Sequence, residues 1–237
     1  MNLLQISDES INQTGIKYIF RQINNYLPPD CACNLIEVGK RVGIAISCGD
    51  EIFSIIKKHI LSSIAEVICI LYKYRLFDEK VVAKGINGDD RELLLSAIIA
   101  ADFDDDKRYA ESKLTEIANI SIDGFFNFRL QKLQKKWDEI SEYIPRYFTS
   151  DELQEFLNYL INEKKGRKIF IENGCVYDGH NRKIERSSLM PKGDNQKLIK
   201  EVLLSGAGEV FVIDRINESD YAWLNKYFGK NFFNAIR

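Results

Sequence analysis

Apolar residues near the start of the chain predict short strands around one helix. Leu3–Ile6 is predicted to be a strand, and apolar residues recur at helical spacing between Ile11 and Leu27. Asn34–Val38 and Val42–Ser47 have the pattern of two strands joined by a glycine-containing reversal. We therefore predict a β-α-β-β unit over residues 1–49.

The middle of the chain has the apolar period of helices, with recognisable helix starts. Asp50 is the predicted N-cap of the first helix, and both Asp89 with Glu92 and Thr149 with Glu152 have the spacing of a capping box. Between Phe126 and Ile144 the apolar residues follow a 4-3-4-3-4 spacing, which predicts a narrow seam for packing against another helix. Together these patterns predict a helical domain over residues 50–166, with helices from Asp50 through Leu71, over Asp89–Ala101, Lys107–Ala118 and Phe126–Ile144, and from Thr149 to Gly166.

The last part of the chain returns to strands. Lys168–Glu172 and Cys175–Tyr177 flank Asn173-Gly174, the strongest short hairpin signal in the sequence. The next predicted elements are a helix over residues 195–205, a strand over Glu209–Ile213, a helix over Ser219–Tyr227 and a strand over Phe232–Ile236. A strand-helix-strand order places the last two strands parallel. We predict a C-terminal α/β unit with short strands over residues 167–237.

The whole pattern predicts an α+β fold in which a helical middle region is flanked by the two strand-containing units, as separate domains or packed as one body.

With 33 basic and 35 acidic side chains the formal charge is -2, which argues against a protein whose main task is to coat nucleic acid. The most apolar stretch, His59–Tyr72, has 14 residues and contains Glu66, whereas a membrane span needs about 20. The five cysteines are irregularly spaced, which favours free thiols in a cytoplasmic protein.

Charge is distributed unevenly along the chain. Ten basic and four acidic residues lie between Lys164 and Lys200, a net of +6, and residues 89–116 carry a net of -5. The basic stretch is a candidate site for phosphate, nucleic acid or an acidic protein, and the alternative is an ordinary solvated surface or pairing with the acidic stretch. Few aromatic residues lie within it, which weakens the interpretation as a single-strand binder. The candidate anion-binding residues are Lys164, Lys165, Arg167, Lys168, Arg182, Lys183 and Arg186.

Motifs for catalysis, metal or cofactor binding are lacking in the sequence. Gly206-Ala207-Gly208 follows a predicted helix and precedes a strand, so it is predicted to end the helix and not to bind a dinucleotide. The run Asp102–Asp106 lacks the glycine and glutamate of a calcium loop and is predicted to be a solvated bend. Cys31 and Cys33 have no matching pair for zinc, and His59 and His180 are the only histidines. We therefore expect no catalytic residues, metal or cofactor.

One local segment, Ile122–Leu130, combines a helix start with three phenylalanines. Asp123 is expected to accept backbone N–H groups, and Gly124 leaves room for another chain. Arg129 is expected to bind a carboxylate. The segment is either a helix entry with an aromatic plug and an internal ion pair, or a partner-binding groove. Its candidate residues are Asp123, Gly124, Phe125, Asn127, Phe128 and Arg129.

This segment resembles the signature of the YtxC-like family, proteins associated with sporulation in endospore-forming bacteria. The resemblance runs from Ile70 through Asp123-Gly124-Phe125 and Phe156–Leu160 to Glu209–Ile213, and before residue 50 it is one of pattern only. Asp123 stands where the family pattern has Glu. The resemblance implies a sporulation role in a cytoplasmic compartment, without established catalytic residues, cofactor or substrate.

Three functional hypotheses follow from the sequence. The first is a non-enzymatic sporulation-associated protein that acts by binding an unknown protein partner. The second is a nucleic-acid or phosphate-binding module that uses residues 164–200. The third is an enzyme whose site is assembled from distant residues.

Overall fold

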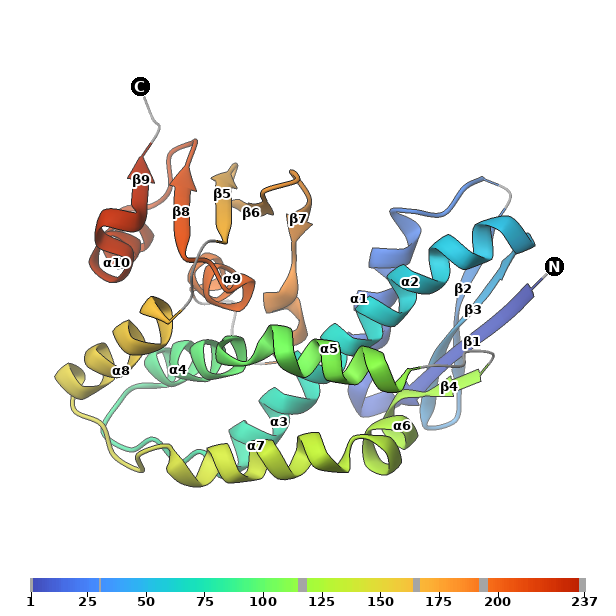
Figure 1. Cartoon of the computed structure of the whole chain (residues 1–237), viewed down its shortest axis with the longest axis horizontal. Helices are drawn as coiled ribbons and strands as arrows, with labels where there is room; N and C mark the ends of the chain where they lie inside the picture. Colours follow the sequence, from blue (N-terminus) through green and yellow to red (C-terminus); the bar gives the residue numbers. More distant parts are fainter. Residues whose placement is uncertain (1, 30, 115–118, 164–166, 192–195, 235–237) are drawn as a thin grey trace. The chain divides into compact units, whose positions relative to one another are not determined.

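The computed structural model describes residues 2–29, 31–114, 119–163, 167–191 and 196–234, and the side chains at positions 2 and 50–52 are not considered. The fold is α+β, as predicted (Figure 1). The chain forms two compact units, each built from two separate stretches. The first unit contains residues 1–73 and 104–139, and the second unit contains residues 74–103 and 140–237.

These units divide the predicted helical middle region between them. The predicted boundaries near residues 49 and 166 are not the boundaries of the compact units, which fall near residues 73, 103 and 139. The reason lies in the packing: in the second unit the helix Gly88–Ala101 contacts both the helix Ser150–Asn162 and the helix Lys197–Ser205, which lie on the two sides of the predicted boundary at residue 166. Whether residues 1–49, 50–166 and 167–237 fold separately stays a prediction.

The first unit contains a four-stranded sheet in the order β2-β3-β1-β4. β3 pairs antiparallel with both β1 and β2, and β4 is parallel to β1. The predicted β-α-β-β unit is confirmed, with α1 between β1 and β2; β4 was not predicted because three residues carry little periodic signal. The strands are β1 (Asn2–Glu9), β2 (Ala32–Val38), β3 (Arg41–Cys48) and β4 (Asn119–Ser121).

Helices cover one face of this sheet. Leu4, Ile6, Ile44 and Ile46 are buried on that face, where α1 contacts β1 and β3 and packs against α2. Strand residues alternate between faces, so the side chains between these buried ones point to the opposite face, called here the open face. On β1 and β3 these side chains are mostly small or polar, with the exposed Leu3 as an exception. The elements are η1 (Ser10–Asn12), α1 (Gln13–Asn24), α2 (Asp50–Val67), the π-helical turn η2 (Ile68–Tyr72), α5 (Phe103–Lys113), α6 (Ile122–Arg129) and α7 (Gln131–Tyr143).

Several predicted helix limits need correction. Gly49, not Asp50, is the N-cap of α2. The predicted continuous helix over Phe126–Ile144 is two helices, α6 and α7, which meet at Leu130.

α5 begins at Phe103, and Asp102 does lie in the turn before this helix. Asp104, Asp105 and Asp106, however, lie in its first helical turn and not in the predicted bend. Negative side chains are favourable there because they face the positive end of the helix dipole.

The second unit contains a five-stranded sheet in the order β7-β6-β5-β8-β9 (Figure 1). β5, β8 and β9 are parallel neighbours, and β6 pairs antiparallel with β5. The hairpin at Asn173-Gly174 and the parallel arrangement of the last two strands are therefore confirmed, whereas the two-residue β7 was not predicted. The strands are β5 (Lys168–Glu172), β6 (Cys175–Asp178), β7 (Lys183–Ile184), β8 (Glu209–Val212) and β9 (Phe232–Asn234).

Capping residues set where several helices of the second unit begin and end. The predicted capping box of Thr149 and Glu152 is confirmed, and Gly206 ends α9 in the left-handed region at φ 68°. The start of α4 differs from the prediction: the Asn87 side chain accepts the Asp90 N–H, so Asn87 takes the N-cap position. The elements are α3 (Lys73–Lys80), α4 (Gly88–Ala101), α8 (Ser150–Asn162), η3 (Arg186–Leu189), α9 (Lys197–Ser205), α10 (Glu218–Phe228) and η4 (Gly229–Asn231).

Candidate functional site

Three phenylalanines lie side by side across the C-terminal sheet. Phe170 on β5 is in register with Phe211 on β8, and Phe211 is in register with Phe233 on β9. The ring centroids are 5.3 Å apart for Phe170 and Phe211 and 4.6 Å apart for Phe211 and Phe233. Tyr177 on β6 continues the row by register with Phe170. We call Phe170, Phe211 and Phe233 the aromatic ridge.

Strand alternation puts the ridge on the face away from the buried core. Ile169 and Ile171 on β5 and Val210 and Val212 on β8 are fully buried, and the phenylalanines between them point to the opposite, outer face. Phe170 and Phe211 are half-buried, and Phe233 on the edge strand is 40% exposed. Apolar surface therefore remains accessible along the ridge.

The ring orientations decide what this surface can bind. The interplanar angles are 25° for Phe170 and Phe211 and 13° for Phe211 and Phe233, so the rings are stacked on one another. Their spacing is close to the roughly 4.8 Å between neighbouring strands, as expected for rings that stand upright on the sheet. Because neighbouring rings occupy most of the ring faces, mainly ring edges are available to a ligand. The ridge is an apolar strip and not a flat platform for nucleobases.

Charged pairs of both signs border the ridge. Lys168 lies 3.4 Å from Glu209, and its ammonium is 5.8 Å from the centre of the Phe211 ring. Lys183 lies 2.7 Å from Glu185, and the hydrogen bond to this carboxylate raises the pKa of Lys183. The outer face thus has an apolar centre and a rim in which each of these lysines is already paired.

The other predicted anion-binding residues are also engaged within the chain. Arg167 donates to the carbonyl oxygen of Ser205 at 2.6 Å, and Arg182 forms an ion pair with Asp178 at 2.7 Å. Arg186 donates to the carbonyl oxygen of Leu204 at 3.0 Å, and its guanidinium lies 4.2 Å from the centre of the Phe103 ring. Lys164 and Lys165 lie outside the described residues.

The Asp123 segment forms an internal ion pair, with a different arginine from the one expected. Arg41 binds both carboxylate oxygens of Asp123, at 2.7 and 3.2 Å, and this lowers the pKa of Asp123. Ser121 is the N-cap of α6 and accepts the Gly124 N–H at 3.3 Å, and a hydrogen bond from the Gly124 backbone also lowers the pKa of Asp123, as expected for a carboxylate at a helix start. Arg129 is exposed and forms no ion pair within the described ranges.

The phenylalanines of this segment have different roles. The ring of Phe126 lies 4.7 Å from that of Tyr72 and 5.9 Å from that of Trp137, so it anchors the helix start. Phe128 is 78% exposed, Phe125 is half-buried, and Asn127 is exposed. The predicted aromatic plug therefore includes Phe126 but not Phe128.

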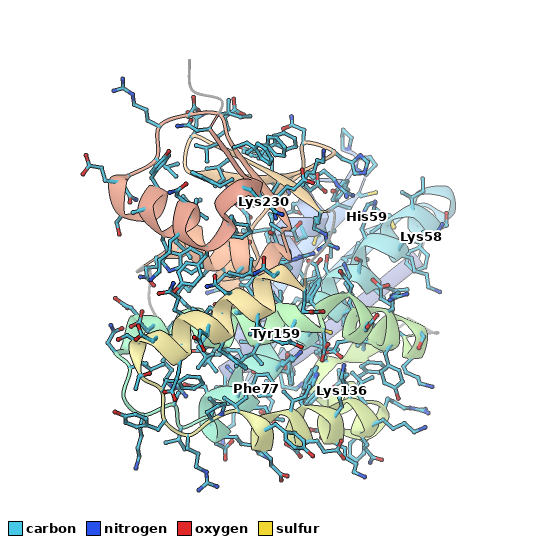
Figure 2. All side chains as sticks on the ribbon, turned by 60° about the vertical axis from the view of Figure 1, so that its left-hand side comes forward. Lys58, His59, Phe77, Lys136, Tyr159 and Lys230 are labelled. Carbon is cyan, nitrogen blue, oxygen red and sulfur yellow. The ribbon has the colours of Figure 1, made fainter. Side chains whose placement is uncertain are left out.

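A buried polar cluster in the first unit was missed by sequence reasoning. Asp106 accepts hydrogen bonds from Lys73, Lys136 and Trp137, each at 2.8 Å; Lys136 is on α7 (Figure 2). Burial alone would raise the pKa of Asp106, but the Lys73 ammonium and these hydrogen bonds outweigh it and lower the pKa. The carboxylate is saturated by donors, so its role is structural. Its position between buried Phe103 and Ala110 on one helix face is the signal that could have revealed it.

Other candidate sites are possible metal-ligand groups, the histidine His59 and one surface depression. Among the described residues, no group of three or more His, Cys, Asp and Glu side chains could hold a metal ion. His59 stacks on Tyr26 with ring centroids 4.1 Å apart. A depression of about 250 Å³, which includes open solvent, has no ionisable lining residue; it is formed by Ala97, Ala100, Leu160, Ile161, Leu203, Gly206, Ala207 and Phe228.

Comparisons with protein-family models, curated proteins and solved structures find no match to the chain. The resemblance to the YtxC-like family stays a prediction. Within the described ranges, no helix is both long enough and apolar enough to cross a membrane.

Proposed function

We propose that this is a non-enzymatic, sporulation-associated protein of endospore-forming bacteria that binds another protein through the outer face of its C-terminal sheet. The sporulation role and cytoplasmic location rest on the family resemblance. The binding mode rests on one observation, the stacked row of Phe170, Phe211 and Phe233 on a face that stays partly exposed.

The composition of this face supports a protein partner. Protein interfaces have an apolar, often aromatic centre and a polar rim, and aromatic residues at the centre carry much of the binding energy. The ridge supplies the centre, and the Lys168–Glu209 and Lys183–Glu185 pairs supply a rim of both signs. A partner with an apolar patch bordered by both signs of charge fits this surface.

Nucleic-acid binding is the second candidate function. Lysines beside aromatic residues on a sheet face favour it, since single-stranded nucleic acid binds through base stacking and phosphate contacts. However, Lys168 and Lys183 are paired with glutamates, and the ring faces of the ridge are stacked on each other. These features favour the protein partner.

The variant Phe233→Ala tests the proposed binding mode. Phe233 is on the edge strand β9, so its removal shortens the ridge without opening the buried core. Tyr159→Ala is the matched control, because Tyr159 is 61% exposed on α8, outside the sheet (Figure 2). Circular dichroism and thermal unfolding establish that both variants fold.

The measurement is quantitative co-purification from sporulating cells with the wild type and both variants. We expect a specific protein to be recovered with the wild type and Tyr159→Ala and reduced at least about tenfold with Phe233→Ala, as for a residue at the centre of an interface. Equal recovery with Phe233→Ala, or no specific protein with the wild type, would contradict the proposal.

A binding titration with a single-stranded oligonucleotide tests the second candidate function, nucleic-acid binding. Phosphate contacts make nucleic-acid binding fall steeply with salt. Binding at low salt that disappears at high salt, and is weakened by Lys168→Ala, would favour the nucleic-acid function. No binding at low salt removes it.

A further inference from the structure

An interaction surface in the first unit is separate from the aromatic ridge. β2 is an edge strand of the N-terminal sheet, paired on one side with β3. An edge strand presents backbone N–H and C=O groups that another strand can bind. We propose that β2 pairs antiparallel with β2 of a second copy of this chain, which joins the two N-terminal sheets.

The side chains of β2 support this assignment. Leu35, Ile36 and Val38 are 43%, 40% and 71% exposed, although they lie in regular strand structure. Natural edge strands commonly avoid pairing through lysine, proline or a bulge, and the sequence Ala32–Val38 contains neither lysine nor proline. Its register with β3 runs without a bulge. The one charged residue of the strand is Glu37.

The hairpin geometry fixes which backbone groups face the open edge. Two residues, Gly39 and Lys40, join β2 to β3, and Gly39 has a φ of 60°. In a hairpin with a two-residue loop, the flanking pair, here Val38 and Arg41, is hydrogen-bonded, and such pairs then alternate with non-bonded ones along the strands. The N–H and C=O groups of the alternate residues Cys33, Leu35 and Glu37 therefore point away from β3.

These outward-pointing backbone groups can pair with the same groups of a second copy related by a two-fold axis at Leu35. When Leu35 lies opposite Leu35 of the second copy, Cys33 lies opposite Glu37 of that copy, and the outward backbone groups of both strands meet. On the open face of the joined sheets, the Val38 side chain lies opposite Ala32 of the second copy, and the Ile36 side chain lies opposite Asn34 of the second copy. All seven residues of the strand are paired, and the helix-covered faces of both sheets lie on the same side.

Charge is compatible with this register. Glu37 meets Cys33 of the second copy and not another glutamate, so like charges are not opposed. Burial raises the pKa of Cys33 to about 11, which keeps its thiol neutral near pH 7. Strand pairing alone gives a small interface, so the dimer should form in a concentration-dependent way.

Sedimentation velocity over a range of concentrations tests the dimer. The variant Leu35→Lys places two ammonium groups opposite each other at the two-fold axis. Leu3→Lys is the matched control, because Leu3 is a 59% exposed leucine on the central strand β1 of the same sheet. We expect the wild type and Leu3→Lys to dimerise as concentration rises and Leu35→Lys to stay monomeric. A monomeric wild type, or a dimer that persists in Leu35→Lys, would overturn the proposal.

Cross-linking tests the register independently of the lysine variant. In Glu37→Cys, the new thiol lies opposite the native Cys33 of the second copy, at the Cα separation of about 5.5 Å that suits a disulfide. Mild oxidation should give a covalent dimer, and the additional change Cys33→Ser should abolish it. If no covalent dimer forms, or if it survives Cys33→Ser, the register is wrong.

Discussion

The two sheets leave apolar side chains exposed in different places. On the open face of the N-terminal sheet, β1 and β3 carry mostly small or polar side chains, for example Ser7, Ala45 and Ser47, with Leu3 as an exposed exception. The other exposed apolar residues of this sheet lie on the edge strand β2. The C-terminal sheet has its exposed apolar residues in a row across the outer face. An edge can be extended by another strand, whereas a face binds through side chains. The same α+β layering therefore supports two different modes of association.

The buried polar groups of the two units also differ. In the first unit, the Asp106 carboxylate is held by two ammonium groups and an indole N–H. In the second unit, Glu201 accepts from backbone N–H groups of Arg186 and Ser187 and from the Ser187 hydroxyl, and burial raises its pKa. The Asp106 carboxylate is thus held largely by charged side chains, whereas the Glu201 carboxylate is held by backbone N–H groups and a hydroxyl.

The largest effect is expected from Asp106→Ala. It leaves the buried Lys73 without this carboxylate, and breaking a buried ion pair typically costs about 3–5 kcal/mol of unfolding free energy. Urea unfolding measures the loss. The double variant Lys73→Met with Asp106→Leu should lose much less, because no charge of the pair stays buried. Equal losses in the single and double variants would contradict a dependence on the charge pair.

A smaller, pH-dependent effect is expected at Asp8 in the first unit. Burial raises its pKa from 3.8 to about 6, against the hydrogen bonds from Asn12 and Tyr72. The folded state therefore holds a proton that the unfolded chain has lost, so stability falls by about 2 kcal/mol as pH rises from about 4 to about 6.

Asp8→Asn should remove this fall, because an amide does not titrate. The measurement is the unfolding free energy of both proteins across this pH range. Parallel curves for the wild type and the variant would show that Asp8 has no such role. The difference between the two curves isolates Asp8 from the other carboxylates.

The smallest effect is expected at the start of α8 in the second unit. Thr149→Ala removes the side chain that caps the Glu152 N–H, which should cost about 1 kcal/mol. Ser150→Ala, at the next, exposed position, should change stability by less than about 0.5 kcal/mol. Thermal unfolding distinguishes the two variants, and an equal effect at both positions would argue against the cap.

Elements with short-range signals could be predicted from the sequence. The reversal at Gly39-Lys40, the hairpin at Asn173-Gly174, the cap at Thr149 and the helix end at Gly206 each depend on a few adjacent residues. Such signals act before any tertiary contact forms, so the local pattern contains them.

Features that depend on sheet order or long-range pairing could not be predicted. Phe170, Phe211 and Phe233 lie 41 and 22 residues apart, and only the order β5-β8-β9 places them together. Asp106 is separated from Lys73 by 33 residues, and Asp123 from Arg41 by 82. Charge patterns identify acidic and basic stretches but do not tell which partners meet in the fold.

Site-specific photo-cross-linking in sporulating cells tests the role of the aromatic ridge most directly. A photoreactive phenylalanine analogue is placed at position 233 and, as the control, at position 159 on α8. We predict one defined cross-linked protein from position 233 and none of that product from position 159. No product from position 233, or the same product from both positions, would contradict a docking surface at the ridge.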